Sequence, residues 1–198
     1  MHKMINNLKK KIGKFIEKKT VKNLNLEITK HVTGEIVLDN GCGNGSFVYE
    51  KHRDKQIYGC DINPGSVRNR GAVDFRLCNS IKLPYESDRF DCLVFSGVIQ
   101  YVEDYEKSLG EIKRVLKNNG RLIIATVNRK SLFRKLGLIN PAPKREGGEF
   151  NMFSFEELKK ILIKDRFRIE KVLGVDFIRM PRALCSNSLI IAKNIKKF

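Results

Sequence analysis

An apolar strand that ends in a carboxylate and runs into three alternating glycines constrains this chain more than any other feature. The stretch reads Val37-Leu38-Asp39-Asn40-Gly41-Cys42-Gly43-Asn44-Gly45-Ser46-Phe47. Glycine has no Cβ, so the backbone here can turn tightly and a ligand can approach it closely. The stretch therefore predicts a turn from a strand into a helix, with a ligand lying against the glycines.

From Glu35 onward, short β-rich runs alternate with helical patterns, which is typical of a parallel sheet covered by helices. The predicted strands are Ile36–Asp39, Gln56–Cys60, Ala72–Leu77, Phe90–Phe95, Arg121–Val127, about Phe167–Leu173 and about Ser188–Ala192. The predicted helices are Gly45–His52, Asp104–Leu116, which Asn118-Asn119-Gly120 should end, and one that begins with a capping box at Ser154 and Glu157. We therefore expect a Rossmann-like α/β fold. It is a doubly wound, mostly parallel sheet of seven strands, with helices on both faces and an antiparallel edge strand near the C-terminus.

The length suits a single domain, because 198 residues leave no room for a second one of ordinary size. We divide residues 1–198 into a basic helical extension (1–30), a core (35–127), a basic and apolar insertion (128–155) and a C-terminal helix with strands (156–198). In the extension, residues 4–19 form a predicted amphipathic helix whose apolar stripe consists of Ile5, Leu8, Ile12, Phe15 and Ile16. This stripe either packs on the domain or lies on a membrane surface.

The net charge of +17 comes mostly from two segments. Residues 1–30 carry nine lysines against Glu17 and Glu27, and residues 129–145 carry six basic residues and no acid, so together they account for 13 of the 17 charges. Such a field attracts nucleic acid, acidic lipid heads and phosphorylated metabolites, and it does not choose among them. A basic binding face, a solvated surface and a general bias of composition all remain open.

The five cysteines lie at neither C-x-x-C nor zinc-ligand spacing. They are Cys42, Cys60, Cys78, Cys92 and Cys185. We expect reduced thiols, most of them beside apolar runs, in a cytoplasmic protein. No apolar run is long enough for a signal peptide or a membrane span, and no cluster of acids predicts a metal site. The expected location is the cytoplasm, either free or peripheral at a membrane surface.

The glycine turn favours S-adenosylmethionine over NAD as its ligand. The dinucleotide fingerprint G-x-G-x-x-G places its third glycine one residue later than this chain does. Asp39 would also repel a pyrophosphate, whereas it suits a cationic ammonium group. Asp61 ends the second predicted strand about 20 residues after Gly41, where an acid can accept both hydroxyls of a ribose. Capping the next helix is the alternative role of Asp61.

Two further stretches complete a resemblance to a known family. They read Cys78-Asn79-Ser80-Ile81-Lys82-Leu83-Pro84-Tyr85 and Phe90-Asp91-Cys92-Leu93-Val94-Phe95-Ser96. Together with the glycine turn and Asp61, they make the chain resemble the Rossmann-like (class I) S-adenosylmethionine-dependent methyltransferases, in particular the small-molecule branch. The resemblance covers about Glu35 to Thr126. It implies S-adenosyl-L-methionine as the cofactor and in-line transfer of its methyl group to an acceptor.

The resemblance assigns a part of the cofactor to the end of each strand. The implied contacts are Asp39, Gly41, Cys42, Gly43 and Gly45 for the methionine part, Asp61 for the ribose, Ile62 for the adenine face, Asn79 with Ser80 or Ile81 for the adenine edge, and Ser96 and Gly97 beside the sulfonium. Asn79 departs from the aspartate that is usual in the family, although an amide oxygen also accepts a hydrogen bond from an amino group. Tyr101 stands where the family often has a histidine.

The same resemblance places the acceptor between the N-terminal extension and the insertion at 128–155, which contain the two basic segments. Gln100 and Tyr101 are the candidates to line the acceptor side, either as catalytic groups or as pocket wall, and no general base is identified. We expect a small-molecule acceptor that is anionic, or linked to a lipid or a nucleotide. An RNA acceptor such as tRNA is one alternative, and a non-catalytic cofactor-binding protein is another. The oligomeric state is left open.

Overall fold

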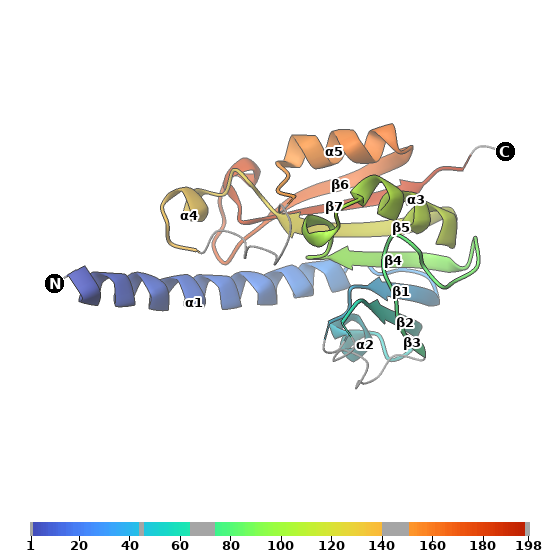
Figure 1. Cartoon of the computed structure of the whole chain (residues 1–198), viewed down its shortest axis with the longest axis horizontal. Coiled ribbons are helices and arrows are strands. Elements are labelled where there is room, and N and C mark those ends of the chain that lie inside the picture. Colours follow the sequence, from blue (N-terminus) through green and yellow to red (C-terminus); the bar gives the residue numbers. More distant parts are fainter. Residues whose placement is uncertain (1, 44–45, 64–73, 140–150, 197–198) are drawn as a thin grey trace.

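A seven-stranded sheet flanked by helices forms the chain, as seen in a computed structural model (Figure 1). The structure describes residues 2–43, 46–63, 74–139 and 151–196, with the side chains of the first helix from Asn7 onward. The strands are β1 (Ile36–Asn40), β2 (Gln56–Asp61), β3 (Asp74–Leu77), β4 (Phe90–Ser96), β5 (Leu116–Val127), β6 (Phe167–Val175) and β7 (Asn187–Asn194). Their order is β3-β2-β1-β4-β5-β7-β6, so the order reverses between β1 and β4. In such sheets, ligands bind beyond the carboxyl ends of the strands at this reversal.

All strands but one of this sheet run in the same direction. β1 pairs in parallel with β2 and β4, β2 with β3, and β4 with β5, whereas β7 is antiparallel to both β5 and β6. The predicted antiparallel strand is therefore β7, but it lies one position inside the edge, which β6 forms. The chain crosses from β5 to β6 and leaves a gap, which β7 fills by turning back from β6.

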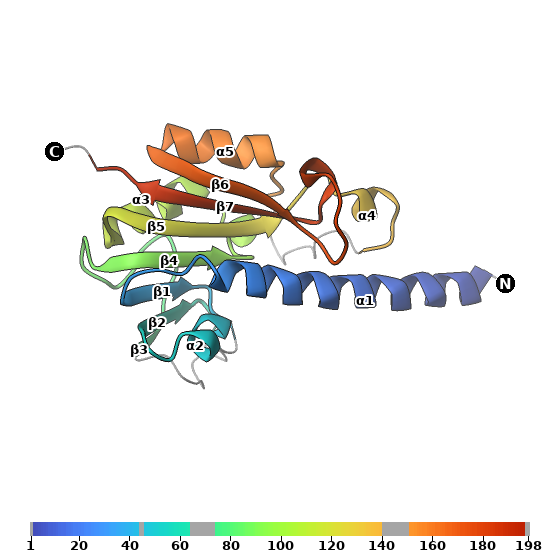
Figure 2. The same ribbon diagram turned by 180° about the vertical axis from the view of Figure 1, so that it is seen from behind.

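Helices cover both faces of the sheet, as expected (Figures 1 and 2). They are α1 (His2–Thr29), α2 (Phe47–Lys51), α3 (Tyr105–Val115), α4 (Leu132–Lys135) and α5 (Phe155–Lys164), with short 3-10 turns η2 (Ile99–Tyr101) and η3 (Arg182–Leu184). On one face, Leu109 of α3 and Leu158 of α5 pack in a cluster with Leu38. On the other, Leu24 of α1 and Val48 of α2 pack in a cluster with Val37. Neighbouring residues of β1 thus face opposite layers, as the alternation of a strand requires.

The end of α3 differs from the prediction. The helix ends at Val115, and Leu116 already pairs with Phe90 of β4, so β5 begins before the Asn118-Asn119-Gly120 stretch. Asn119 does adopt the predicted left-handed conformation, with φ of 62°, but it does so inside β5. The register between β4 and β5 shifts between Phe90 and Cys92. The turn-forming residues therefore lie at an irregularity within β5 and do not end the helix. The predicted capping box of Ser154 and Glu157 is confirmed at the start of α5.

The first helix is longer than predicted, and it buries a different stripe. α1 continues for 28 residues to Thr29, and its N-terminal half extends past the sheet (Figures 1 and 2). Of the predicted stripe, only Ile16 is buried, while Leu8, Ile12 and Phe15 are exposed and the side chain of Ile5 lies outside the described residues. The buried positions of the helix are Gly13, Ile16, Thr20, Leu24 and Ile28. Partners distant in sequence, rather than the helical pattern alone, therefore decide which side is covered.

The segment around α4 packs on the projecting half of α1. Ile16 forms a small apolar cluster with Phe133 and Ile139. A Cβ atom on Gly13 would overlap with the carbonyl oxygen of Leu138, so a glycine is needed where the two segments cross. The described part of the second basic segment, residues 129–139, therefore lies beside the N-terminal half of α1 at one end of the molecule (Figures 1 and 2).

Candidate active site

The glycine turn lies at the carboxyl end of β1, beside the reversal of strand order. Gly41 and Gly43 have φ angles of 85° and 57°, in the left-handed region that favours glycine. A Cβ atom on Gly41 would overlap with the side chain of Val98, whereas the space beside Gly43 is open within 4 Å. The turn is thus closed on one side by protein and open on the other to a ligand. Gly45 lies outside the described residues.

Asp39 lies beneath this turn with only 2% of its surface exposed. Its Oδ2 atom is buried and has no hydrogen-bond partner among the described residues. Burial raises the pKa of this carboxyl to about 6, a hydrogen bond with Ser46 acts in the opposite direction, and the nearby charge of Asp61 raises the pKa further. A buried carboxylate oxygen without a partner is costly on its own and is stabilised by a cation.

Asp61, at the end of β2, ties that strand to the glycine turn. Its carboxylate accepts hydrogen bonds from the backbone N–H groups of Gly43 at 2.8 Å and Asn63 at 2.9 Å. The backbone N–H of Gly41 in turn donates to the carbonyl oxygen of Cys60 at 2.6 Å. These bonds orient the carboxylate, and Ile62 beside it is 62% exposed and available to a ligand.

The loop after β3 carries the predicted adenine-binding residues. Asn79 accepts a hydrogen bond from the backbone N–H of Ile81 through its Oδ1 atom, at 3.2 Å. Of the two backbone amides predicted to contact the adenine ring, that of Ile81 therefore already donates a hydrogen bond to Asn79. The other belongs to Ser80, which is largely buried. A carboxamide oxygen has two lone pairs, so the Oδ1 atom of Asn79 can accept a second hydrogen bond.

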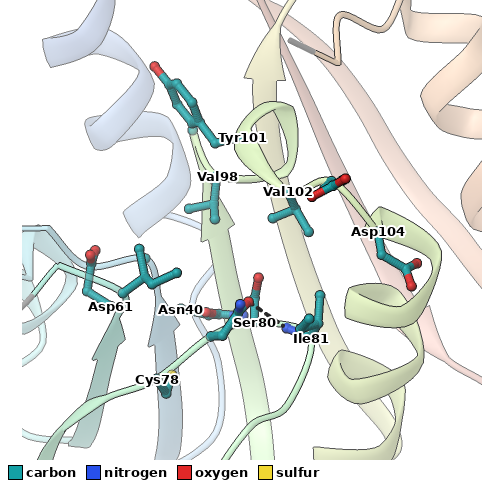
Figure 3. A pocket seen from close by; sticks show the side chains of 14 residues that line it. Asn40, Asp61, Cys78, Ser80, Ile81, Val98, Tyr101, Val102 and Asp104 are labelled. Carbon is teal, nitrogen blue, oxygen red and sulfur yellow. Dashed lines mark hydrogen bonds between the residues drawn. The ribbon is translucent and has the colours of Figure 1, made fainter. Parts of the chain in front are cut away.

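The end of β4 and the η2 turn form the opposite wall. Gly97 has a φ of 71° and donates its N–H to the carbonyl oxygen of Ala125 at 2.8 Å. The structure places the two acceptor-side candidates differently. Tyr101 is 39% exposed and points towards α1 (Figure 3). Gln100 is buried, and its Oε1 atom accepts a hydrogen bond from the hydroxyl of Thr126 at 2.8 Å.

These loops enclose a cavity of about 520 Å³ (Figure 3). Its walls contain seven of the predicted site residues, namely Gly41, Asp61, Ile62, Asn79, Ser80, Ile81 and Gly97, together with the candidate Tyr101. The sequence reasoning missed Asn40, Cys78, Val98, Val102, Glu103 and Asp104. Asn40 ends β1, Cys78 directly follows β3, and the other four lie just before η2 or between η2 and α3. Their position next to the motifs was the available signal. The described wall does not include five further predicted residues, namely Asp39, Cys42, Gly43, Ser96 and Gln100.

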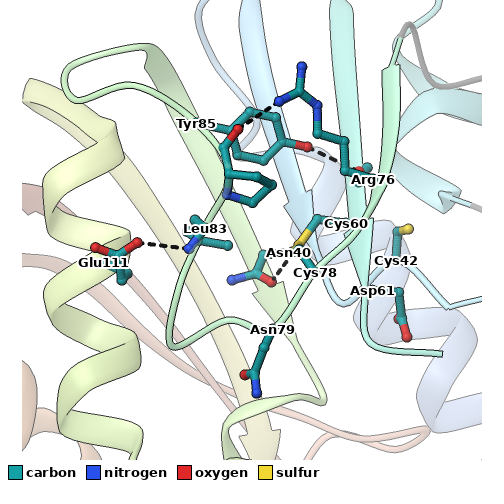
Figure 4. The surroundings of a disulfide bond; sticks show 12 residues. Asn40, Cys42, Cys60, Asp61, Arg76, Cys78, Asn79, Leu83, Tyr85 and Glu111 are labelled. Atoms are coloured by element: carbon teal, nitrogen blue, oxygen red, sulfur yellow. Dashed lines mark hydrogen bonds between the residues drawn. A yellow bond between two sulfur atoms is a disulfide. The ribbon is translucent and has the colours of Figure 1, made fainter.

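Two cysteines meet at the wall of this cavity, contrary to the expectation of five free thiols. The structure joins Cys60 and Cys78 in a disulfide, with their Cα atoms 5.7 Å apart (Figure 4). Cys60 belongs to β2 and Cys78 directly follows β3, and these neighbouring parallel strands bring together residues that lie 18 positions apart. Cys42, Cys92 and Cys185 are free and buried. Burial, helped by the charges of Asp39 and Asp61, raises the pKa of the Cys42 thiol to about 12.

The comparison with protein families identifies the class to which this fold and site belong. Residues 31–161 match the family model of the methyltransferase domain. The chain therefore belongs to the class I S-adenosylmethionine-dependent methyltransferases, and its cofactor is S-adenosyl-L-methionine, as predicted.

Two curated relatives are methyltransferases of small molecules or carrier-bound groups. The chain is 35% identical over 101 residues to malonyl-[acyl-carrier protein] O-methyltransferase of Herminiimonas arsenicoxydans, covering 48% of this chain and 38% of the relative. It is 30% identical over 142 residues to the ubiquinone/menaquinone biosynthesis C-methyltransferase of Haemophilus ducreyi, covering 65% and 51%. The chain thus matches about half or less of the length of these relatives.

A solved structure confirms the fold. The 1,6-didemethyltoxoflavin-N1-methyltransferase of Burkholderia thailandensis, solved with 1,6-didemethyltoxoflavin and S-adenosylhomocysteine bound, superposes with a TM-score of 0.67. The sequence identity is 17%, and the superposition covers 98% of this chain and 90% of the other.

The residues of the cavity and of the glycine turn beside it fit this cofactor. The buried, unpartnered Oδ2 atom of Asp39 suits the ammonium group of the methionine part. The open space at Gly43 admits a ligand against the backbone. Among the described residues, there is no group of three or more His, Cys, Asp or Glu side chains that could hold a metal ion.

Proposed function

We propose that this chain transfers the methyl group of S-adenosylmethionine to a small-molecule acceptor that carries an anionic group, such as a lipid- or nucleotide-linked intermediate. The observation that carries the proposal is the position of Arg134 on α4. The half-buried guanidinium of Arg134 lies close enough to Tyr101 to interact with it electrostatically, and Tyr101 forms part of the cavity wall. A guanidinium keeps its charge at neutral pH and can hold a carboxylate or phosphate through two parallel hydrogen bonds.

The surroundings of Arg134 support such a role. Burial lowers the pKa of its guanidinium, and the nearby Glu17 of α1 and Tyr101 of η2 act in the opposite direction. The cation therefore lies where α1, α4 and η2 meet, rather than on the open surface. Arg129, which belongs to the same basic segment, forms an ion pair with Glu157 of α5. We assign the acceptor contact to Arg134 because it lies near Tyr101 of the cavity wall, and a structural contact to Arg129.

The cofactor supplies a methyl group that is already activated on a sulfonium. In our proposal Asp39 binds the ammonium group, Asp61 the ribose hydroxyls, and the loop at Asn79 the adenine edge, while Gly97 leaves room beside the sulfonium. Together these residues fix the position of the donor. For an in-line displacement, alignment of the two reactants lowers the barrier by roughly 7–11 kcal/mol.

The acceptor wall would align the second reactant and exclude water. Val98 and Tyr101 lie across the cavity from Asp61 (Figure 3). Gln100 would contribute indirectly, because its hydrogen bond with Thr126 holds η2 against β5. Besides Asp61, the wall includes the titratable side chains of Tyr101, Glu103 and Asp104. We propose no general base among them, because methyl transfer needs a base only where the acceptor must lose a proton.

We place this reaction in the cytoplasm, free or at a membrane surface. No helix among the described residues combines the length and the apolar composition that crossing a bilayer requires. An RNA acceptor, such as tRNA, is the competing assignment, and it rests on the net charge of +17.

Labelled S-adenosylmethionine tests the proposal. The protein is incubated with the anionic small-molecule and lipid fractions of a cell extract and, separately, with total RNA. We expect the labelled methyl group to enter an anionic small-molecule or lipid fraction, and the Arg134→Gln variant to lose about tenfold or more of this transfer while keeping its affinity for the cofactor. Lys135→Gln, an exposed charge on the same short helix, is the matched control. Label in RNA alone, or equal transfer by both variants, would contradict the proposal.

A further inference from the structure

Along its projecting N-terminal half, α1 carries a row of exposed apolar side chains. Leu8, Ile12 and Phe15 are 59%, 40% and 56% exposed. Their spacings of four and three residues put them on one stripe of the helix. One edge of the Phe15 ring rests on Phe177, with the ring centroids 6.3 Å apart, and the remainder of the ring faces outward. We call Leu8, Ile12 and Phe15 the α1 ridge.

Lysines flank the α1 ridge. The exposed lysines between Asn7 and Lys22 are Lys9, Lys10, Lys11, Lys14, Lys18, Lys19 and Lys22. Lys11, Lys18 and Lys22 repeat at spacings of seven and four residues, so they follow one flank of the ridge. The ammonium group of Lys19 lies 5.8 Å from the centroid of the Phe15 ring. The acid of this stretch, Glu17, is half-buried on the side of Arg134.

The α1 ridge lies at the same end of the molecule as the cavity. The cavity is formed at the carboxyl ends of the parallel strands. The projecting half of α1 extends beyond that end, beside α4 (Figures 1 and 2). A surface that contacts the ridge would therefore lie at the same end of the molecule as the cavity.

We propose that the α1 ridge and its lysines bind the surface of an anionic lipid bilayer. A helix that lies in such a surface buries apolar side chains among the acyl chains and keeps lysines at the level of the headgroups. Anionic headgroups attract several lysines at once, and the attraction acts over a Debye length. This inference goes beyond the proposed function, since binding to a bilayer requires neither the cofactor nor methyl transfer.

Charge and polarity argue against other occupants. A second copy of the chain placed on the same ridge would bring lysines against lysines, which is unfavourable in a protein with a net charge of +17. A nucleic acid would neutralise the lysines but would leave Leu8, Ile12 and Phe15 in water. An anionic bilayer is the partner that satisfies the apolar and the charged side chains together.

The absence of tryptophan from the chain allows a direct test. In the Phe15→Trp variant, the emission should shift to shorter wavelength on addition of phosphatidylcholine vesicles that contain phosphatidylglycerol, and brominated acyl chains should quench it. Ile163→Trp is the matched control, because Ile163 is 53% exposed on α5, at a distance from α1 (Figure 1). Its emission should not change.

Sedimentation with the same vesicles separates the two contributions. The triple variant Leu8→Ser, Ile12→Ser, Phe15→Ser changes only exposed side chains, and we expect it to lose about tenfold or more of the parent's partitioning. Lys11→Gln, Lys18→Gln, Lys22→Gln should lose binding to a similar extent, and vesicles of phosphatidylcholine alone should bind the parent weakly. Ile163→Ser with Lys160→Gln should bind as the parent does.

Four results would overturn the inference. Two are equal partitioning of the ridge variant and the parent, and an unchanged emission of Phe15→Trp. The other two are self-association of the parent that the ridge variant abolishes in the absence of vesicles, and binding of RNA that depends on the ridge. Circular dichroism of each variant verifies that a loss of binding is not a loss of fold.

Discussion

The hydroxyl of Thr20 donates a hydrogen bond of 2.8 Å to the carboxylate of Asp176, which lies 156 residues further along the chain. Both residues are buried. The other oxygen of Asp176 accepts from the backbone N–H of Ser186 at 2.8 Å, and its carbonyl oxygen accepts from the side chain of Asn23 at 3.0 Å. One aspartate therefore joins α1 to the connection between β6 and β7.

Removal of this carboxylate should destabilise the protein. We expect Asp176→Ala to lower the free energy of unfolding by about 2–4 kcal/mol, because several buried donors lose their acceptor. Thr20→Val should cost less, and the double variant should be less destabilised than the sum of the two single changes. Urea unfolding followed by circular dichroism measures these values. Asp54→Ala, at an exposed carboxylate, is the control, and additivity of the two changes would contradict a direct coupling.

Cofactor affinity should depend on the ionisation of Asp39. Burial raises the pKa of its carboxyl to about 6, and the ionised form is the one that binds an ammonium group. Affinity should therefore increase as the pH rises through about 6, from about pH 5 to about pH 7, over which the α-ammonium group itself remains charged. Calorimetry across this range measures the effect, and Asp39→Asn should remove the dependence along with most of the affinity.

The same carboxyl should affect the stability of the protein without cofactor. Its pKa in the folded state lies above the value of 3.8 expected for an unfolded chain, so the folded state holds the proton more tightly. The free energy of unfolding should then fall as the pH rises from about 4 to about 6. Asp39→Asn, which is neutral throughout, should be more stable than the parent above this range. A parent whose stability rises across the interval, unlike Asp39→Asn, would contradict the assignment.

Loss of the Asp61 carboxylate should weaken cofactor binding by about tenfold or more, because a charge-assisted hydrogen bond contributes roughly 1.5–3 kcal/mol. The change also removes the acceptor of the Gly43 amide, so Asp61→Asn, which keeps an acceptor, serves as the comparison. Isothermal titration with S-adenosylhomocysteine separates the two. An unaltered affinity in Asp61→Ala would show that the ribose lies elsewhere.

Asn79→Asp should keep or improve cofactor affinity. A carboxylate oxygen can still accept from the amide of Ile81 and is a stronger acceptor for an adenine amino group than an amide oxygen. Asn79→Ala should lose both interactions, with a loss of about threefold to tenfold. A large loss in Asn79→Asp would assign Asn79 a purely structural role in the loop.

The core of the fold could be predicted because its signals are local. The glycine turn, Asp61 and the capping box at Ser154 are each set by residues a few positions apart, and the structure places them at the ends of strands and helices as expected. The mostly parallel character of the sheet followed from the alternation of strands and helices along the chain. What these patterns predict is where the chain changes direction.

The remaining features depend on residues that are distant in sequence. Helical spacing predicts one apolar stripe for α1, but Asp176 and Leu138 select the side that carries Thr20 and Gly13. The pairing of Cys60 with Cys78 follows from the register of β2 and β3, which no sequence pattern reveals. Gln100 faces the core because Thr126 of β5 offers it a donor.

The contact between Gly41 and Val98 has a consequence for anyone who wishes to redesign the specificity of this protein. The side chain of Val98 fills the space that a Cβ atom at position 41 would need, so the glycine turn that we propose binds the donor and the wall that we propose faces the acceptor form one continuous surface. A larger residue at position 98 would displace the turn that holds the donor, and a smaller one would leave a hole beside it. Directed evolution towards new acceptors should therefore leave Val98 unchanged and begin with Tyr101, whose side chain is 39% exposed.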